Sequence, residues 1–286
     1  MNKIFCKLTR EILPKIRERY PFLYLEKGRL EIDDSSIKWI DCECHVVPLP
    51  IATIAALFLG PGTSITHAAI KALSEANCYV CWVGEDSLLY YASGVSPTSN
   101  TRNIQRQIKL FSDDCLRTEV VRRMFKKRFP YDNLSDKTIH EMMGMEGARV
   151  RRMYRQKAEE YGVVWEGRNY VPGNINSSDS PNKILTLCNS ALYGLVGAVI
   201  HSMGLSPYIG FIHSGSPLPF VYDISDLYKE ESSVDLAFAL SKNQVYDKSI
   251  IVDSFCKRVV DNDILCRITK DISDILEISN DCSNSQ

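Results

Sequence analysis

The periodicity of apolar residues changes once along this chain, and that change most constrains its fold. Before a segment rich in Ser, Thr, Asn and Pro, residues 93–103, apolar residues come in short runs separated by turn signals. After it they recur at intervals of three and four, as in Ile104, Ile108 and Phe111. Short runs between turns predict strands, whereas the longer period predicts helices. We therefore expect the class of secondary structure to change at this segment.

The N-terminal part predicts a β meander rather than βαβ units. Residues 22–50 hold short runs of Leu, Ile, Val, Tyr and Trp, broken by turn-forming residues at 27–28 and 33–36. One helix is expected after the Gly60-Pro61-Gly62 break, capped by Thr63 or Ser64 and running to about residue 76. Two further strands are expected at "CYVCWVG" and "LLYYASG".

The rest of the chain predicts helices, at about residues 104–129, 135–161, 181–203, 220–229, 232–241 and 247–278. The expected fold class is therefore α+β, with a small β-rich N-terminal domain followed by a larger all-α C-terminal domain. We expect the first domain to span residues 1–94, a linker 95–102, and the second domain 103–286.

The chain favours a cytoplasmic protein with reduced thiols. Residues 1–20 show no signal-peptide pattern, and no stretch approaches the roughly 20 apolar residues of a membrane span. The ten cysteines include a Cys42-x-Cys44 pair and a Cys78-x-x-Cys81 pair, whose spacing could bind zinc. The second pair lies in an apolar run that predicts a buried strand. We therefore interpret all four as small core residues.

Charge is balanced overall but unevenly distributed. The chain has 34 Lys+Arg and 35 Asp+Glu, so its net charge does not by itself predict a nucleic-acid partner. Residues 117–157, however, contain twelve Lys/Arg against five Asp/Glu, and residues 226–286 contain seven against twelve. This pattern fits a phosphate-binding surface beside a metal site, or simply two solvated helix faces.

Glu146 interrupts an apolar stripe on the helix expected near 135–161. Steps of three and four place this acid between Met142 and Val150 on the face expected to be buried. A buried carboxylate is costly without a cation or a proton. Arg149, three residues further on, could provide a structural ion pair. A metal ion is the alternative.

A second polar cluster lies in "IHSGSPLPFVYDISD", residues 212–226. Pro219 suits the start of a helix, and Asp223 and Asp226 then share one face of its first turns. These acids could simply stabilise the helix N-terminus, and His213 could be an ordinary loop residue. With Glu146 they form a mixed oxygen and nitrogen set that suits Mg²⁺ or Mn²⁺, and such a metal beside a basic helix suits phosphodiester transfer. Spacing alone does not bring Glu146 and His213 together.

Seven stretches resemble a known family in the order in which they occur. They are "LGPGTSITHAAIKAL", "VGEDSLLYYASG", "VVRRMFKKRF", "GMEGARVRRMY", "YGVVWEGRNY", "ALYGLVGAVI" and "IGFIHSGSPLPFVYDISDLYK". Together, over residues 22–276, they resemble the CRISPR-associated integrase of spacer acquisition, the Cas-one family, in its Cascade-linked type I-E branch. This resemblance implies an N-terminal β domain, a C-terminal helical domain and an asymmetric homodimer. It also implies a complex in which two such dimers flank a dimer of a small partner, Cas-two.

The activity implied by the resemblance is metal-dependent transesterification. The family joins the 3′-hydroxyls of short double-stranded DNA fragments to the ends of a CRISPR repeat, and the same site can nick branched DNA. The implied cofactor is Mg²⁺ or Mn²⁺. By motif, the implied metal ligands are Glu146, His213 and Asp226.

The resemblance also assigns neighbours of the metal. Asp223 matches a further acid beside the site, and Tyr193 matches a tyrosine near the DNA, although it could instead be a core aromatic. Arg149 and Arg151 match basic residues that we expect to face phosphate rather than to pair with Glu146. His67 matches a histidine of the β domain that we expect to be structural.

Two other functions remain open at this stage. One is a structure-specific nuclease acting on branched or single-stranded nucleic acid, and the other is a non-catalytic DNA-binding scaffold. The branch often has Arg or Lys at three positions that are uncharged here, which would weaken contacts to DNA: Ser64, Leu89 and Ser216.

Overall fold

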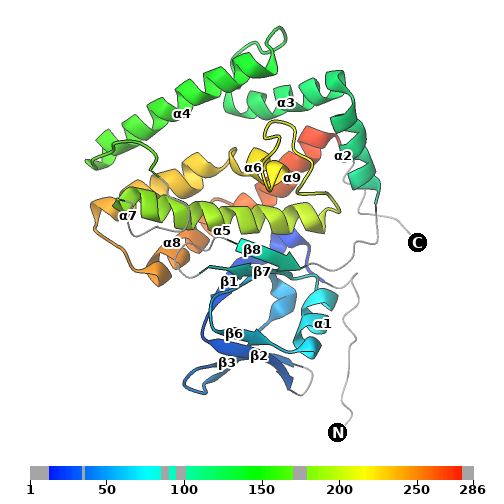
Figure 1. Cartoon of the computed structure of the whole chain (residues 1–286), viewed down its shortest axis with the longest axis vertical. Coiled ribbons are helices and arrows are strands. Elements are labelled where there is room, and N and C mark those ends of the chain that lie inside the picture. Colours follow the sequence, from blue (N-terminus) through cyan, green and yellow to red (C-terminus); the bar gives the residue numbers. More distant parts are fainter. Residues whose placement is uncertain (1–12, 34–35, 85–89, 95–100, 170–178, 279–286) are drawn as a thin grey trace. The chain divides into compact units, whose positions relative to one another are not determined.

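The computed structural model describes residues 13–33, 36–84, 90–94, 101–169 and 179–278. The chain divides into two compact units, residues 1–97 and 98–286 (Figure 1). All the described strands lie in the first unit, and the second is helical, which confirms the predicted α+β class. The domain limits 1–94 and 103–286 stay a prediction. Leu89 and most of the expected linker lie outside the described residues.

One sheet of the first unit contains most of the predicted meander, without the run at residues 22–25, and has an added strand. Strands β2 (Gly28–Asp33), β3 (Ser36–Asp41) and β4 (Val46–Pro48) pair antiparallel in succession. Strand β6 (Thr63–Ile65) joins the free edge of β2 in parallel. Gly28 lies opposite Asp41, and its lack of a side chain leaves room for the ring of Trp39.

The second sheet corrects the expectation that βαβ units are absent. Its order is β1 (Tyr20–Leu25), β5 (Ile54–Leu59), β7 (Tyr79–Val83) and β8 (Tyr90–Gly94). The β1–β5 and β5–β7 pairs are parallel, and only β7–β8 is antiparallel. All six residues of β5 are buried, as is typical of a parallel strand covered on both faces. Strand β5 therefore reads as one apolar run with no alternation that would reveal its pairing.

The helix between β5 and β7 begins later than predicted. Helix α1 spans His67–Glu75, and the Thr66 side chain accepts a hydrogen bond from the backbone N–H of Ala69. Thr63 and Ser64, the two predicted caps, belong instead to β6. Residues of α1 and of both sheets share one apolar core: Leu30, Trp39, Leu57, Ala69, Leu73 and Val80.

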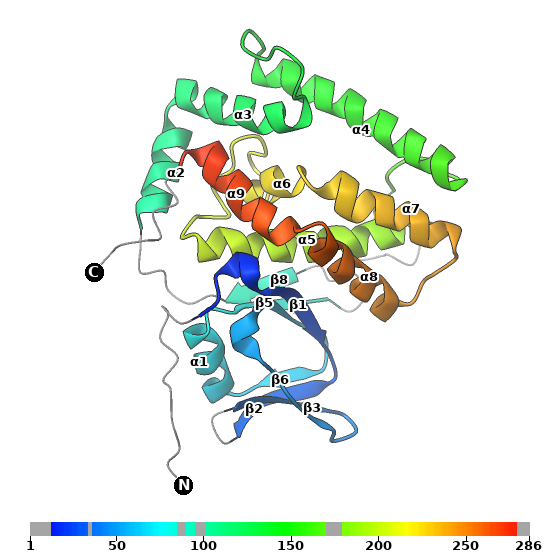
Figure 2. The ribbon, with the colours of Figure 1, turned by 180° about the vertical axis from the view of Figure 1, so that it is seen from behind.

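Helix α5 (Ser180–Ser202) packs against the helical segments that follow it in the chain (Figure 2). It is buried along nearly its whole length, which requires a helix that is apolar on all sides. Among the described helices, it alone is long and apolar enough to cross a membrane, with mean hydropathy 1.6, contrary to our expectation of no such stretch. Because 89% of that stretch is buried inside the protein, α5 has the character of a core helix.

Two predicted long helices are each broken into two by an aspartate. Asp113 has extended backbone angles, and its side chain accepts the Leu116 N–H, so it ends one helix and caps the next. Asp263 adopts a left-handed conformation, φ 50°, which no α-helix interior tolerates. The resulting helices are α2 (Arg102–Ser112), α3 (Asp114–Arg128), α8 (Lys248–Asp261) and α9 (Ile264–Leu276).

Helix α4 (Ile139–Tyr161) carries the predicted apolar stripe. A capping box between Thr138 and Glu141 starts it, and Gly162 in a left-handed conformation ends it. Met142 and Met153 are buried, and Glu146 lies between them with a side chain only 14% exposed. The expectation of an acid on the buried face is therefore confirmed. The remaining described helical segments of the second unit are α6 (Pro219–Ser225), the π-helical turn η4 (Glu230–Val234) and α7 (Asp235–Lys242).

The interpretation of the four cysteines as core residues holds for only one pair. Cys78 and Cys81 are buried beside and within β7, and burial raises the pKa of Cys78 to about 12. Cys42 and Cys44 are exposed in the turn after β3, because this turn lies beyond the edge of the core.

Gly210 is expected to be intolerant of a side chain. A Cβ there would lie 2.6 Å from the Cβ of Pro219 and 2.9 Å from the N of Phe220, where α6 begins. We predict that Gly210→Ala lowers the free energy of unfolding by about 1–3 kcal/mol, measured by urea denaturation. The control is Gly144→Ala in α4, where nothing lies within 4 Å. It should instead be stabilising by about 0.5–1 kcal/mol. Equal stability of the two variants would contradict this packing argument.

Candidate active site

A fully buried carboxylate connects the loop at residues 211–213 to α6. Asp223 accepts hydrogen bonds from the backbone N–H groups of Phe211 (2.6 Å), Ile212 (3.1 Å) and His213 (3.0 Å). It is 0% exposed, so these donors replace the water that an ionised carboxylate would otherwise require. Pro219 begins α6, as predicted, and positions Asp223 one turn later.

The same carboxylate orients His213. The Nδ1 atom of His213 lies 2.7 Å from Asp223, and its Nε2 atom lies 3.7 Å from an oxygen of Asp226. The hydrogen bond to Asp223 raises the pKa of His213, and the charge of Asp226 adds to this effect. A histidine whose one nitrogen is bound to a carboxylate presents the other as a well-directed ligand.

Asp226 has a compensating cation of its own. Its carboxylate lies 2.6 Å from the Nζ of Lys229. Desolvation alone would raise the pKa of Asp226, but the charges of Lys229 and Arg128 outweigh it, and the pKa lies below its usual value. The ammonium of Lys229 also lies 5.1 Å from the ring centroid of Tyr193. Tyr193 is therefore beside Asp226, and its ring packs edge-on against Tyr222.

Glu146 is held by arginines. Arg149 makes a two-point contact with it, Nε to one oxygen at 2.9 Å and Nη2 to the other at 3.1 Å. Arg128, the last residue of α3, brings its Nη1 to 3.3 Å from the carboxylate. The expectation that Arg149 faces phosphate rather than pairing with Glu146 was wrong on this point. All three guanidinium nitrogens of Arg149 are engaged, because Nη1 also contacts Glu230 at 2.5 Å.

The predicted site residues are thus brought together in part. His213, Asp223, Asp226 and Tyr193 form one cluster with Lys229. Glu146 has its own ion pairs and lies outside this cluster. Arg128, which pairs with Glu146, nevertheless also contributes to the lowered pKa of Asp226. Arg151 is exposed on α4, and Ser216 lies in the loop before α6. His67 and Ser64 are exposed residues of the first unit, at the start of α1 and in β6.

A divalent cation fits two of the three predicted ligands. His213 Nε2 and Asp226 face each other, whereas Glu146 directs its oxygens to two guanidinium groups. In the part of the chain that the structure describes, no group of three His, Cys, Asp or Glu side chains is placed to share an ion. Mg²⁺ is commonly held by one or two protein carboxylates, with water and phosphate completing its shell. The chemistry of these donors therefore fits such an ion. Glu146 would become a third ligand only if it gave up an ion pair with an arginine.

Sequence reasoning missed two cations of this site, Lys229 and Arg128. Lys229 had a detectable signal, because it follows Asp226 by three residues, a spacing at which side chains meet on a helix. Arg128 had none. It comes from α3, and only the packing of α3 against α4 brings it to Glu146.

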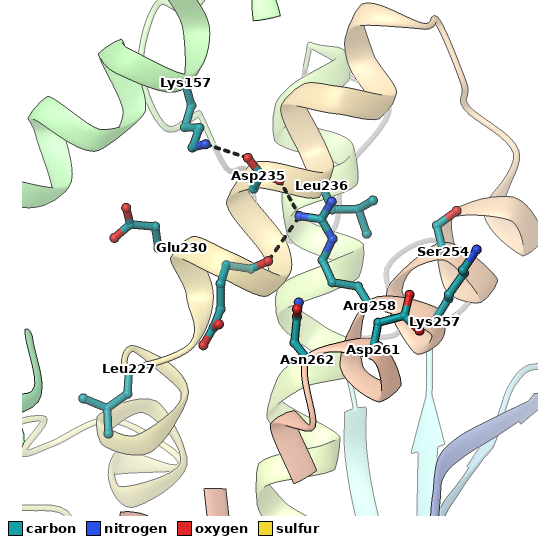
Figure 3. Close-up of a pocket in the computed structure, with 11 residues that line it drawn as sticks. Lys157, Leu227, Glu230, Asp235, Leu236, Ser254, Lys257, Arg258, Asp261 and Asn262 are labelled. Carbon is teal, nitrogen blue, oxygen red and sulfur yellow. Dashed lines mark hydrogen bonds and ion pairs between the residues drawn. The ribbon is translucent and has the colours of Figure 1, made fainter. Parts of the chain in front are cut away.

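A pocket of about 870 Å³ lies between α4, η4, α7 and α8 (Figure 3). Asp235 is central to it and accepts contacts from Lys157 at 2.6 Å, Arg258 at 2.5 Å and Tyr161 at 2.9 Å. Figure 3 shows Lys157 and Arg258 converging on this carboxylate from α4 and α8. The ion pairs of Asp235 therefore connect α7 to α4 and to α8.

We predict that Asp235→Asn destabilises the protein by about 1–3 kcal/mol, because two cations lose their shared counter-charge. The measurement is urea denaturation at pH 7.5. Asp261 lines the same pocket near the C-terminal end of α8, where a negative charge is unfavourable. Asp261→Asn should therefore leave stability unchanged or slightly higher. A loss of the same size in both variants would refute the role of Asp235.

The raised pKa of His213 predicts a pH-dependent contribution to stability. Because its folded-state pKa exceeds the unfolded value of about 6.5, the protonated ring stabilises the fold below that pH. This contribution is lost as pH rises through the folded-state pKa. In chelator, the stability difference between wild type and His213→Gln should be larger at low pH and shrink above the raised pKa. His140→Gln, on the exposed side of α4, is the control. A constant difference across this range would contradict the assignment.

The chain is similar to known proteins, and the similarity includes the residues of this cluster. A family model described as CRISPR associated protein Cas1 matches residues 131–254, a range that includes Glu146, His213 and Asp226. The chain is 55% identical to a protein of Chlorobaculum tepidum described as CRISPR-associated endonuclease Cas1 2, over 96% of this chain and 93% of that protein.

Two further relatives agree. The Escherichia coli (strain K12) protein described as CRISPR-associated endonuclease Cas1 is 32% identical, over 91% of this chain and 86% of its own length. A solved structure described as a TtCas1–DNA complex matches with a TM-score of 0.69 and 37% identity, covering 93% of this chain and all of that one.

Proposed function

This chain belongs to the Cas1 family, and on that premise we propose that it is a metal-dependent DNA integrase and endonuclease of CRISPR adaptation. It would join the 3′-hydroxyls of short DNA fragments to the ends of a CRISPR repeat by transesterification. The observation that supports this most strongly is the Asp223–His213–Asp226 arrangement, in which a buried acid directs a histidine nitrogen toward a second acid.

The residues of the site suit a phosphoryl-transfer centre. His213 and Asp226 would hold Mg²⁺ or Mn²⁺, with Glu146 as the third ligand, and the ion would polarise the scissile phosphate and orient the attacking hydroxyl. Asp223 keeps the imidazole fixed, so that no rearrangement of the ring is needed when the ligand set is complete. Lys229 and Tyr193 border Asp226 and would meet the DNA backbone there.

DNA and protein partners are proposed on the same basis. One relative forms a complex with DNA, and the helical unit of this chain carries a surplus of Lys and Arg over residues 117–157, with Arg151 exposed. We propose a homodimer that binds a small Cas-two dimer, a cytoplasmic location and membership of the type I-E branch. Co-elution of the purified chain with the Cas-two protein of the same genome would test the assembly.

A second candidate function is cleavage without integration. The relatives are described as endonucleases, and the same residues would serve if water replaced the 3′-hydroxyl as the nucleophile. A supercoiled target bearing a CRISPR repeat, offered with a short duplex, separates the two functions. Joined products favour integration, whereas nicked or cut DNA alone favours a nuclease. A non-catalytic scaffold would give neither, with or without chelator.

We predict that Glu146→Gln and His213→Ala each slow strand joining at least about a hundredfold, because each removes a proposed ligand of the ion. Product formation is followed on gels with Mn²⁺ and with EDTA, while circular dichroism checks the fold. Glu159→Ala, on the exposed side of α4, should retain the wild-type rate. Wild-type joining by either ligand variant would overturn the site assignment.

A further inference from the structure

Arg128 has an unusual position for an arginine. Its side chain is only 5% exposed, and one nitrogen, Nη1, lies 3.3 Å from Glu146. The other two nitrogens, Nε and Nη2, are buried, and neither has a hydrogen-bond partner among the described residues. The guanidinium lies 5.4 Å from the ring centroid of Phe125, a favourable but weak contact. Buried donors without acceptors are costly and rare in folded proteins.

The position of Arg128 matters because Glu146 is a proposed metal ligand. Its Nη1 forms an ion pair with that carboxylate, which Arg149 also holds through a two-point contact. A fixed positive charge at this carboxylate does in part what a divalent cation would do, since it compensates the negative charge of a largely buried acid.

A phosphate-binding role explains these observations less well. The two unpartnered nitrogens have no contact with solvent, so DNA could not reach them in this arrangement. A purely structural ion pair is also a poor explanation, because such a pair is favourable only when the remaining donors are satisfied. The arrangement is better suited to a cation that holds Glu146 temporarily.

We propose that Arg128 is a resident counter-ion of the acidic site, which pairs with Glu146 beside Arg149 in the metal-free protein and releases it when a divalent cation binds. Arg128 is thus a positioning residue that competes with the metal and sets its affinity. The inference rests on the proposed function, because it requires that Glu146 and Asp226 take a cation. Beyond that function, we infer that Arg128, which is not itself a ligand, lowers the affinity of the site for the cation.

The test compares Mn²⁺ affinity of the full-length protein and its variants, measured by the electron paramagnetic resonance signal of free Mn²⁺ at constant salt. We expect Arg128→Gln to bind Mn²⁺ roughly tenfold more tightly, because a positive charge near the ion is removed. Arg128→Lys keeps the charge and should stay near wild type. In chelator, Arg128→Gln should melt at a lower temperature, and Mn²⁺ should raise its melting temperature more than that of wild type.

Arg123→Gln is the matched control. Arg123 lies on the same helix and is half-buried, but it contacts the backbone oxygen of Ile275 and the side chain of Glu277. Its loss should leave Mn²⁺ affinity unchanged even if stability falls. An unchanged or weaker affinity in folded Arg128→Gln would overturn the counter-ion role. If wild type itself binds no Mn²⁺, the metal-dependent function fails, and the inference fails with it.

A second measurement avoids the risk that Arg128→Gln does not fold. In wild-type protein with ¹⁵N-labelled arginine, the side-chain Nε resonance of Arg128 can be assigned by its absence from Arg128→Lys. Saturating Mg²⁺ should shift that resonance and leave the Arg123 resonance in place. An unmoved Arg128 resonance under conditions where Mg²⁺ binds would show that the pair with Glu146 survives, which contradicts the proposal.

Discussion

The burial of Asp223 is the constraint on which the candidate site depends. An ionised carboxylate without contact with water must receive hydrogen bonds from the protein, and here three consecutive backbone N–H groups and one imidazole provide them. Meeting that demand fixes the loop at residues 211–213 against α6. It also fixes the ring of His213. The hydrogen bonds that stabilise the buried carboxylate therefore also orient the proposed metal ligand.

Glu146 and Asp226 are paired with cations that come from different segments of the chain. Lys229 lies one turn beyond Asp226, whereas Arg128 comes from α3 and Arg149 from α4. A largely buried carboxylate without a paired cation would weaken the fold. The same compensation appears in the neighbouring pocket, where Asp235 is shared by Lys157 and Arg258. In this unit, these acids are therefore neutralised by nearby Lys and Arg side chains. A metal ion that binds these acids would have to replace some of these ion pairs.

Local signals in the chain predicted much of the secondary structure and part of the site. The stripe on α4, the position of Glu146 on it, and Pro219 at the start of α6 all follow from helical period and capping chemistry. The breaks at Asp113 and Asp263 were missed, because an apolar period that continues across a break hides it. The parallel pairing of β5 was also missed, since a fully buried strand shows no alternation that reveals its neighbours.

By itself the sequence determined the α+β class, the family resemblance and the candidate acids, because period, turn chemistry and motif order are properties of short stretches. Only the tertiary structure decided which charges meet. Arg128 and Glu146 are 18 positions apart on different helices, and Arg149 turned out to pair with Glu146 rather than to stand free. Ion pairs between helices depend on how their faces pack, and no local pattern records that packing.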